Sequence, residues 1–319
     1  MPLSLVGSEM CIRDSCLMRM RMIIIYFDMK INTIFRMRYI LFITCFALSQ
    51  FFLANCEKSQ DSSKIVIAGG SLTEIVYFLD YSDKIAGIDV TSNYPSDTAN
   101  LPSIGYVRAL STEGILSLKP SLILGEDDMG PPLVIDQLEL TGVDLRIIDE
   151  GHSANGILQK INCISSVLGV DTNLVSSKIE LLEQDINKLN KLAMDNQNSK
   201  IKVMLILNMQ GTSPIVAGKG TSGDGFIKMT GALNVADNFE GWKPISSESI
   251  ISYNPDYIII TNRGMGSFTD TKSLSETTAL RFTDAAKEQN ILSEDGMAML
   301  GFGVRTIAAA LKFAETFQQ

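Results

Sequence analysis

The sequence has 319 residues, of which 45% are hydrophobic and 20% are charged. This composition excludes an intrinsically disordered chain, and the length suits about two domains. A formal net charge of -9 argues against nucleic-acid binding, and a single His leaves little room for a multi-histidine metal site or a Ser-His catalytic pair.

The first 56 residues are expected to be a leader that does not belong to the fold. Residues 37–56 begin with basic character and continue with an apolar run from Tyr39 to Ala54, which is typical of a signal peptide. The run is shorter than the about 20 residues that a membrane-spanning helix needs. Residues 1–36 are expected to be non-native or mis-called leader sequence. The mature chain is therefore expected to be exported.

The cysteines near and after the leader raise two questions. Leu53-Ala54-Asn55-Cys56 is similar to a lipobox, in which the Cys receives a lipid, but Asn55 is bulkier than the residues that such sites favour. Lipidation of Cys56 and ordinary cleavage nearby therefore stay open as alternatives. Cys163 is the only cysteine in 57–319, so we expect a buried thiol there and no disulfide framework within that range.

Residues 57–170 alternate between strand and helix patterns. An apolar strand at 64–68 is followed by Gly69-Gly70 and by Ser71-Leu-Thr-Glu74, a capping-box pattern that predicts a helix through Leu79. Similar patterns predict strands at 84–90, 122–124 and 143–148 and helices at 131–140 and 157–168. This alternation predicts an α/β lobe with a mainly parallel sheet flanked by helices.

A long helix is predicted to separate this lobe from a second one. Asp171 is a suitable N-cap, and residues 172–196 contain no Gly or Pro and repeat apolar residues at steps of three and four. We therefore expect a linker helix over 171–197. A new strand at 202–207 begins the second α/β lobe, over 198–319.

The two lobes share an internal repeat. Residues 110–124 align without gaps on 245–259 at a constant offset of 135, and Glu113 matches Glu248. In each copy a Ser is expected to cap a short helix that an apolar strand follows. The architecture predicted is two similar lobes joined by one backbone helix.

Several motifs resemble those of the haem-binding substrate-binding proteins of bacterial haem ABC transporters, which belong to the cobalamin and ferric-siderophore binding class. The most specific stretch is Gly105-Tyr-Val-Arg-Ala-Leu-Ser-Thr-Glu-Gly114. The other stretches that carry the resemblance are 68–74, 217–226, 241–248 and 301–306.

The resemblance implies a periplasmic or otherwise extracytoplasmic carrier, not an enzyme. Such a carrier takes ferric haem b into the cleft between its lobes and delivers it to an ABC permease dimer, with an outer-membrane haem receptor system upstream. A cobalamin or ferric-siderophore carrier of the same fold is the alternative. A metal-handling enzyme would need clustered acid-base residues, which the sequence does not show.

The resemblance also implies roles for single residues. Tyr106 matches the tyrosine that ligates haem iron, and Arg108 matches the arginine that hydrogen-bonds its oxygen; a nearby cation favours the phenolate form of a tyrosine. Met209 stands where the family often has a second ligand, His, so it is either an axial or face contact or a core residue. Further candidates for the haem pocket, each with core packing or a surface position as its alternative, are Tyr94, Trp242, Phe302, Lys219 and Arg305.

Expectations for the acidic residues and the single histidine concern docking and solvent exposure. In the family, glutamates that match Glu113 and Glu248 pair with arginines of the two permease subunits, and charge pairs of this kind guide docking. His152 is expected to be a solvated loop residue. The acidic run at 126–128 is expected to be solvated and to have no role in chemistry.

Overall fold

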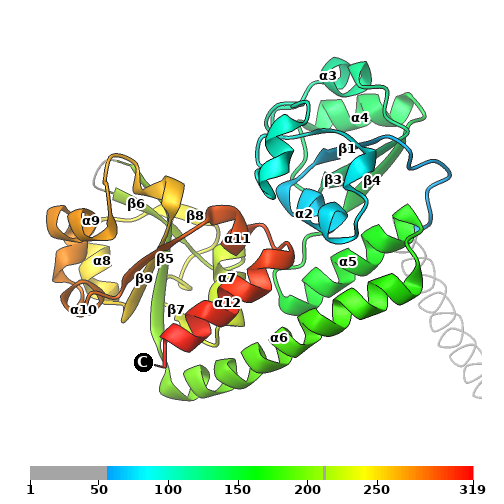
Figure 1. The fold of residues 1–319 in the computed structure, drawn as a ribbon. Coiled ribbons are helices and arrows are strands. Elements are labelled where there is room, and N and C mark those ends of the chain that lie inside the picture. Colours follow the sequence, from blue (N-terminus) through cyan, green and yellow to red (C-terminus); the bar gives the residue numbers. More distant parts are fainter. Residues whose placement is uncertain (1–55, 211–212, 319) are drawn as a thin grey trace, which may run out of the picture. The chain divides into compact units, whose positions relative to one another are not determined.

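The computed structural model describes residues 56–210 and 213–318 and forms an α/β fold with two sheets (Figure 1). The N-terminal lobe contains a four-stranded parallel sheet in the order β2-β1-β3-β4. Its strands are β1 (Ile65–Ala68), β2 (Ile85–Ile88), β3 (Leu122–Glu126) and β4 (Asp144–Ile148). Its helices are α2 (Gly70–Phe78), α3 (Thr112–Ser117), α4 (Pro132–Leu140) and α5 (Ala154–Leu168). The parallel sheet confirms the fold class predicted from the alternation.

The capping box predicted for α2 is wrong. The helix has Gly69 as its N-cap, and no side-chain hydrogen bond caps it. Ser71 instead donates from its N–H and its hydroxyl to Glu126 Oε1, at 3.1 and 2.6 Å. The adjacent strand β3 therefore supplies the acceptor for this end of the helix, which a local pattern does not reveal.

The backbone helix α6 (Thr172–Ser199) begins as the sequence predicts. The Asp171 carboxylate accepts hydrogen bonds from the N–H groups of Asn173 and Leu174, at 2.9 and 3.3 Å. The helix packs on α5 of the N-terminal lobe and on α12 (Val304–Thr316) of the C-terminal lobe (Figure 1). Near its end the buried Asn196 amide donates to the carbonyls of Thr230 and Ala314.

The C-terminal lobe contains a mixed six-stranded sheet. Strand β5 pairs in parallel with β7 and β9, and β9 pairs in parallel with β10, whereas β6 is antiparallel to both of its neighbours, β5 and β8. The strands are β5 (Lys202–Gln210), β6 (Ser213–Ala217), β7 (Leu233–Asn234), β8 (Trp242–Pro244), β9 (Tyr257–Thr261) and β10 (Ile291–Glu294). The helices before α12 are α7 (Ser222–Met229), α8 (Ser247–Tyr253), α9 (Thr271–Thr277), α10 (Asp284–Lys287) and α11 (Gly296–Leu300).

The predicted repeat is present as matching helix–strand units. Ser111 caps α3 by accepting from Gly114 N–H, and Ser246 caps α8 by accepting from Ser249 N–H. Each helix is followed by a buried strand, β3 in one lobe and β9 in the other. The lobes otherwise differ, because only the second contains antiparallel strands.

One buried apolar cluster runs through both lobes. It joins Ile67 and Leu72 of the N-terminal lobe to Leu189 of α6 and to Leu205 and Phe313 of the C-terminal lobe. An ion pair also crosses between the lobes, from Arg305 to Glu74 at 2.6 Å. These contacts predict limited relative movement of the lobes.

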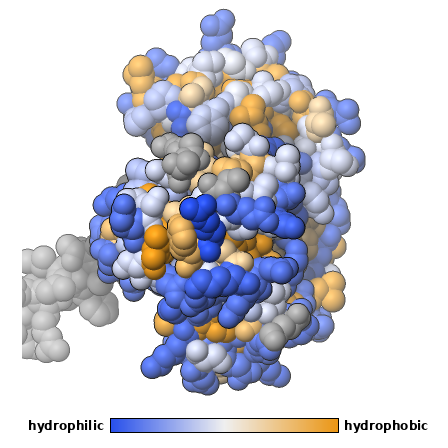
Figure 2. Space-filling view, turned by 90° about the vertical axis from the view of Figure 1, so that its left-hand side faces the viewer, coloured by the Kyte–Doolittle hydropathy of each residue, from blue (hydrophilic) through white to orange (hydrophobic). Residues whose placement is uncertain are grey.

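No membrane-spanning helix is found in the part of the chain that the structure describes. None of the helices there combines the length and apolar character that crossing a bilayer requires. The face in Figure 2 is mainly hydrophilic, with small separate apolar patches. The signal peptide predicted at 37–56 lies outside the described residues, except for Cys56.

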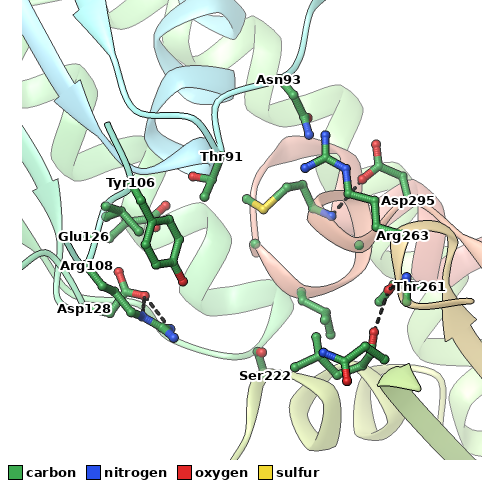
Figure 3. A pocket seen from close by; sticks show the side chains of 18 of the residues that line it. Thr91, Asn93, Tyr106, Arg108, Glu126, Asp128, Ser222, Thr261, Arg263 and Asp295 are labelled. Atoms are coloured by element: carbon green, nitrogen blue, oxygen red, sulfur yellow. Dashed lines mark hydrogen bonds and ion pairs between the residues drawn. The ribbon is translucent and has the colours of Figure 1, made fainter. Parts of the chain in front are cut away.

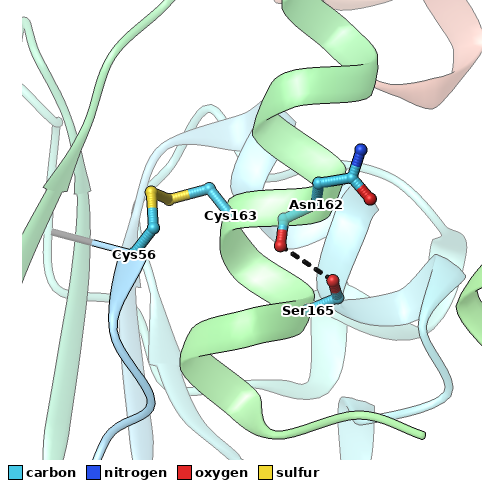
Figure 4. The surroundings of a disulfide bond; sticks show 4 residues. All are labelled: Cys56, Asn162, Cys163 and Ser165. Atoms are coloured by element: carbon cyan, nitrogen blue, oxygen red, sulfur yellow. Dashed lines mark hydrogen bonds between the residues drawn. A yellow bond between two sulfur atoms is a disulfide. The ribbon is translucent and has the colours of Figure 1, made fainter. Parts of the chain in front are cut away.

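The prediction of a free thiol at Cys163 is wrong, because Cys56 pairs with it. Cys56 forms a disulfide with Cys163 of α5, across 107 residues of sequence (Figure 4). Cys163 is therefore not a buried free thiol. A sulfur in a disulfide cannot carry a lipid as well, so the disulfide and lipidation of Cys56 exclude each other.

Candidate functional site

A pocket of about 450 Å³ lies between the two lobes, at the carboxyl ends of their parallel strands. Ligands of open α/β sheets bind outside these strand ends, and the volume lies within the range of small-molecule sites. Figure 3 shows side chains from both lobes converging on this space. The N-terminal lobe contributes Thr91, Asn93, Tyr106, Val107, Arg108, Glu126, Asp128 and Glu150. From the C-terminal lobe the lining includes Leu207, Asn208, Ser222, Trp242, Thr261, Arg263, Asp295 and Met297.

Tyr106 and Arg108 both line the pocket, as the resemblance implies for them. They lie in the loop before α3, and the Tyr106 side chain is 46% exposed. Arg108 donates to Asp128 Oδ2 from Nε at 2.8 Å and from Nη2 at 2.6 Å. Among the described residues no hydrogen bond joins Arg108 to Tyr106. The hydrogen bond to Asp128 raises the pKa of Arg108, so its guanidinium is a positive charge on the pocket wall.

A network of buried charged residues lies beside Tyr106 in the N-terminal lobe. Glu126, at the end of β3, is only 6% exposed and bonds to Ser71. The Lys160 side chain is fully buried, and its ammonium nitrogen lies 2.9 Å from Ser71 Oγ and 3.3 Å from Glu150 Oε1. Burial, with the negative charge of Glu150, raises the pKa of Glu126 to about 8. The expectation that the acidic run is solvated is wrong for Glu126, because β3 carries it into the interior.

The shifted carboxyl predicts a pH dependence of stability. Glu126 has an ordinary pKa of 4.5 and a folded value of about 8, so between these pH values the folded chain holds a proton that the unfolded chain releases. Its contribution to the free energy of unfolding is therefore complete below the ordinary value and falls as pH rises through the folded one. We expect Glu126→Gln to flatten this decline in urea unfolding between about pH 5 and pH 8. The exposed Glu139→Gln is the control, and an unchanged slope in Glu126→Gln would contradict the assignment.

Asn208, and not Met209, lines the pocket from the C-terminal lobe. Met204 and Ile206 of β5 lie in one buried cluster, and a β-bulge between Ile206 and Asn208 shifts the alternation of the strand. Met209 therefore packs against that same cluster, while Asn208 and Leu207 line the pocket. Of the two alternatives for Met209, the structure shows core packing. Among the described residues, Oδ1 of Asn208 is buried and accepts no hydrogen bond.

Trp242 and Arg263 complete the wall formed by the C-terminal lobe. Trp242 begins β8 and lies against the start of α7, where a Cβ at position 223 would be only 2.9 Å from the indole, so Gly223 gives the ring room. Arg263 follows β9 in a 3-10 turn, Asn262–Met265, and is an exposed cation on the pocket lining (Figure 3). Arg263 and Asn208 are pocket residues that were not predicted from the sequence. Their positions at the ends of predicted strands were the signal that could have found them.

Four of the other candidates lie outside the pocket lining. Arg305 bonds to Glu74 and to Asp295, at 2.6 and 3.1 Å, and its guanidinium lies 4.0 Å from the ring centre of Tyr94. It therefore bridges the lobes and is neither a surface charge nor a pocket cation. Lys219 is exposed. Phe302 is fully buried in the core.

His152 lies in the loop between β4 and α5, as expected, but its side chain is only partly solvated. Its ring lies 5.0 Å from that of Phe302, and its side chain is 33% exposed. Burial lowers the pKa of His152, which favours the neutral form. In the described part of the chain, no group of three or more His, Cys, Asp or Glu could hold a metal ion. His152 is therefore a packing residue.

The paired glutamates are exposed at matching places in the two lobes. Glu113 lies in the first turn of α3 and Glu248 in the first turn of α8. The repeat predicted this placement, since each helix starts at its capping Ser. Both carboxylates are available for a partner protein.

A family model described as periplasmic binding protein matches residues 65–295, which is most of the chain. The chain belongs to the periplasmic binding protein family. This periplasmic binding protein shares its two-lobed fold with solved relatives and is an extracytoplasmic substrate-binding protein, not an enzyme.

Solved structures similar to this periplasmic binding protein include two carriers of haem. The periplasmic heme-binding protein RhuT from Roseiflexus sp. RS-1 is 31% identical with a TM-score of 0.74, over 81% of this chain and 98% of that one. The heme-binding protein BhuT in complex with two hemes is 29% identical with a TM-score of 0.72, over 81% and 98% of the chains.

Curated relatives are more distant. An uncharacterized ABC transporter substrate-binding lipoprotein, YvrC of Bacillus subtilis, is 23% identical over 81% of this chain and 80% of the relative. The vitamin B12-binding protein of Yersinia pestis is 23% identical over 64% of this chain and 71% of the relative.

Proposed function

We propose that this protein captures ferric haem b between its lobes and delivers it to an ABC permease for haem and iron uptake. The observation that carries the proposal is Tyr106, an exposed phenol on the pocket wall beside the Arg108 guanidinium. Tyrosinate is one of the ligands that proteins use for haem iron, and a neighbouring cation favours it. The haem-binding solved structures, at about 30% identity, support the same ligand.

The remaining pocket residues suit the other parts of haem. Trp242, Leu207 and Met297 offer apolar surface for a porphyrin face. Arg263 is the cation that would meet a haem propionate, in place of Lys219 and Arg305, which lie outside the pocket lining. Apolar burial contributes about 25 cal/mol per Å² to such binding. Cobalamin is the second candidate ligand, since vitamin B12-binding proteins are among the relatives.

A titration of the exported protein with hemin, cobalamin and a ferric siderophore tests the proposal. We expect hemin alone to give saturable binding at a simple stoichiometry, with a tyrosinate-to-iron charge-transfer band in the visible spectrum. Binding of cobalamin or of a siderophore in preference to hemin would overturn the haem assignment and leave the family unchanged.

The geometry of β5 predicts how a histidine on the second lobe would act. Because Asn208 lines the pocket and Met209 packs in the core, we expect Asn208→His to add a nitrogen ligand opposite Tyr106. The ferric hemin complex should then change from five-coordinate high-spin to six-coordinate low-spin in its visible and electron paramagnetic resonance spectra. Met209→His is the matched control and should leave the iron five-coordinate. The reverse pattern would show that the bulge is placed wrongly.

The permease is the proposed partner of Glu113 and Glu248, and an outer-membrane haem receptor system is the proposed upstream supplier. Because charge complementarity sets docking orientation and rate, we expect Glu113→Lys with Glu248→Lys to lower haem uptake by cells on the order of tenfold. Hemin affinity of the purified variant should not change, since neither residue lines the pocket. Glu180→Lys, an exposed exchange on α6, is the control. Normal uptake by the double variant would exclude these glutamates from docking.

A further inference from the structure

The N-terminal segment is held against α5 by more than one kind of contact. Cys56 is joined to Cys163 with their Cα atoms 4.8 Å apart (Figure 4). Three residues later, the N–H of Ser59 donates to the carbonyl of Val167 at 2.9 Å, and Ser59 is 5% exposed. The Lys58 side chain lies against Gly169, just beyond the end of the same helix. Backbone and side-chain contacts thus bring Cys56 to the surface of α5 that carries Cys163.

The sulfur of Cys56 has two exclusive chemical fates. Lipidation of a lipobox cysteine replaces the S–H bond by a thioether to a diacylglycerol. A disulfide uses the same sulfur for a bond to Cys163, which is the only other cysteine after the leader. Asn55 also departs from the small residue that a lipobox favours. Both the fold and the local sequence therefore favour the disulfide.

We infer that Cys56 is a disulfide cysteine in the exported protein and that the mature chain is released without a lipid anchor. Cys56 and Cys163 together lose two protons and two electrons as the S–S bond forms. The acceptor is a protein disulfide of the export compartment, which is reduced to a dithiol; compartments outside the cytoplasm sustain such oxidation. In this respect the protein differs from its relative YvrC, which is described as a lipoprotein.

Expression of the full chain with its own leader, followed by cell fractionation, tests this inference without any ligand. We expect the mature protein in the soluble fraction, with an intact mass that leaves no room for a diacylglycerol. A peptide map should contain a Cys56 peptide linked to the Cys163 peptide, and reduction should separate the two. Alkylation before reduction should label neither cysteine.

Cys56→Ser is the control for location, because it removes the sulfur that either fate requires. The variant should fractionate as the unchanged protein does and should expose one alkylatable thiol at Cys163. A diacylglycerol on an N-terminal Cys56, a freely alkylated Cys163 in the unchanged protein, or a shift of Cys56→Ser from the membrane to the soluble fraction would overturn the inference. None of these outcomes depends on whether the protein binds haem.

Discussion

Tyr106→Phe is expected to weaken hemin binding by about 100-fold, which corresponds to about 2.8 kcal/mol. The exchange removes only the phenol oxygen, so the aromatic surface of the pocket wall stays in place. Porphyrin burial against Trp242 and the apolar side chains should leave residual binding. The charge-transfer band of the ferric complex should disappear, because its donor oxygen is lost. Absorbance titration with hemin measures both effects.

Tyr94→Phe is the matched control for this experiment. Tyr94 and Tyr106 are equally exposed, at 46%, but only Tyr106 lines the pocket. We expect Tyr94→Phe to retain both the affinity and the band. If Tyr106→Phe kept the spectrum of the unchanged protein, a different residue would ligate the iron and the site would be assigned wrongly.

Lys160→Met is expected to destabilise the fold by about 3–5 kcal/mol, the cost of removing one partner from a buried ion pair. The Lys160 side chain is completely buried, and its ammonium lies beside Glu150 and Ser71. Without it, the carboxyls of Glu126 and Glu150 face each other without a cation. Urea unfolding followed by circular dichroism should show a lower midpoint with a similar slope.

Two comparisons separate charge from packing in this result. Lys160→Met combined with Glu150→Gln should recover part of the loss, because the second exchange neutralises the carboxylate left behind. Lys272→Met removes a cation whose side chain is 83% exposed and should change stability by less than about 1 kcal/mol. Equal effects of Lys160→Met and Lys272→Met on the free energy of unfolding would show that the buried ion pair contributes no more to stability than an exposed one.

Features set by local interactions were predictable from the sequence. The caps of α3, α6 and α8 follow from Ser111, Asp171 and Ser246, respectively, whose side chains accept hydrogen bonds from N–H groups two or three residues away. The alternation of strands and helices required only the spacing of apolar residues. Tyr106 and Arg108 were assigned by the resemblance of the stretch around them to a known family, and both line the pocket.

Long-range contacts changed the assignment of several side chains. A bulge in β5 exchanged the positions of Met209 and Asn208, since one extra residue reverses which face a side chain takes. Glu126 became a buried group because Ser71 and the Lys160 network enclose it. Arg305 is held outside the pocket lining by its hydrogen bonds to Glu74, a residue 231 positions away in the sequence.

The sequence by itself determined the order of the elements, the starts of α3, α6 and α8 and the two halves of the repeat, because hydrogen bonds and apolar spacing within a few residues specify them. Only the tertiary structure decided the burial of Glu126, the pairing of Arg305 and the disulfide between Cys56 and Cys163. These depend on residues that are distant in sequence and adjacent only after the sheets and α6 have packed, so no local pattern encodes them.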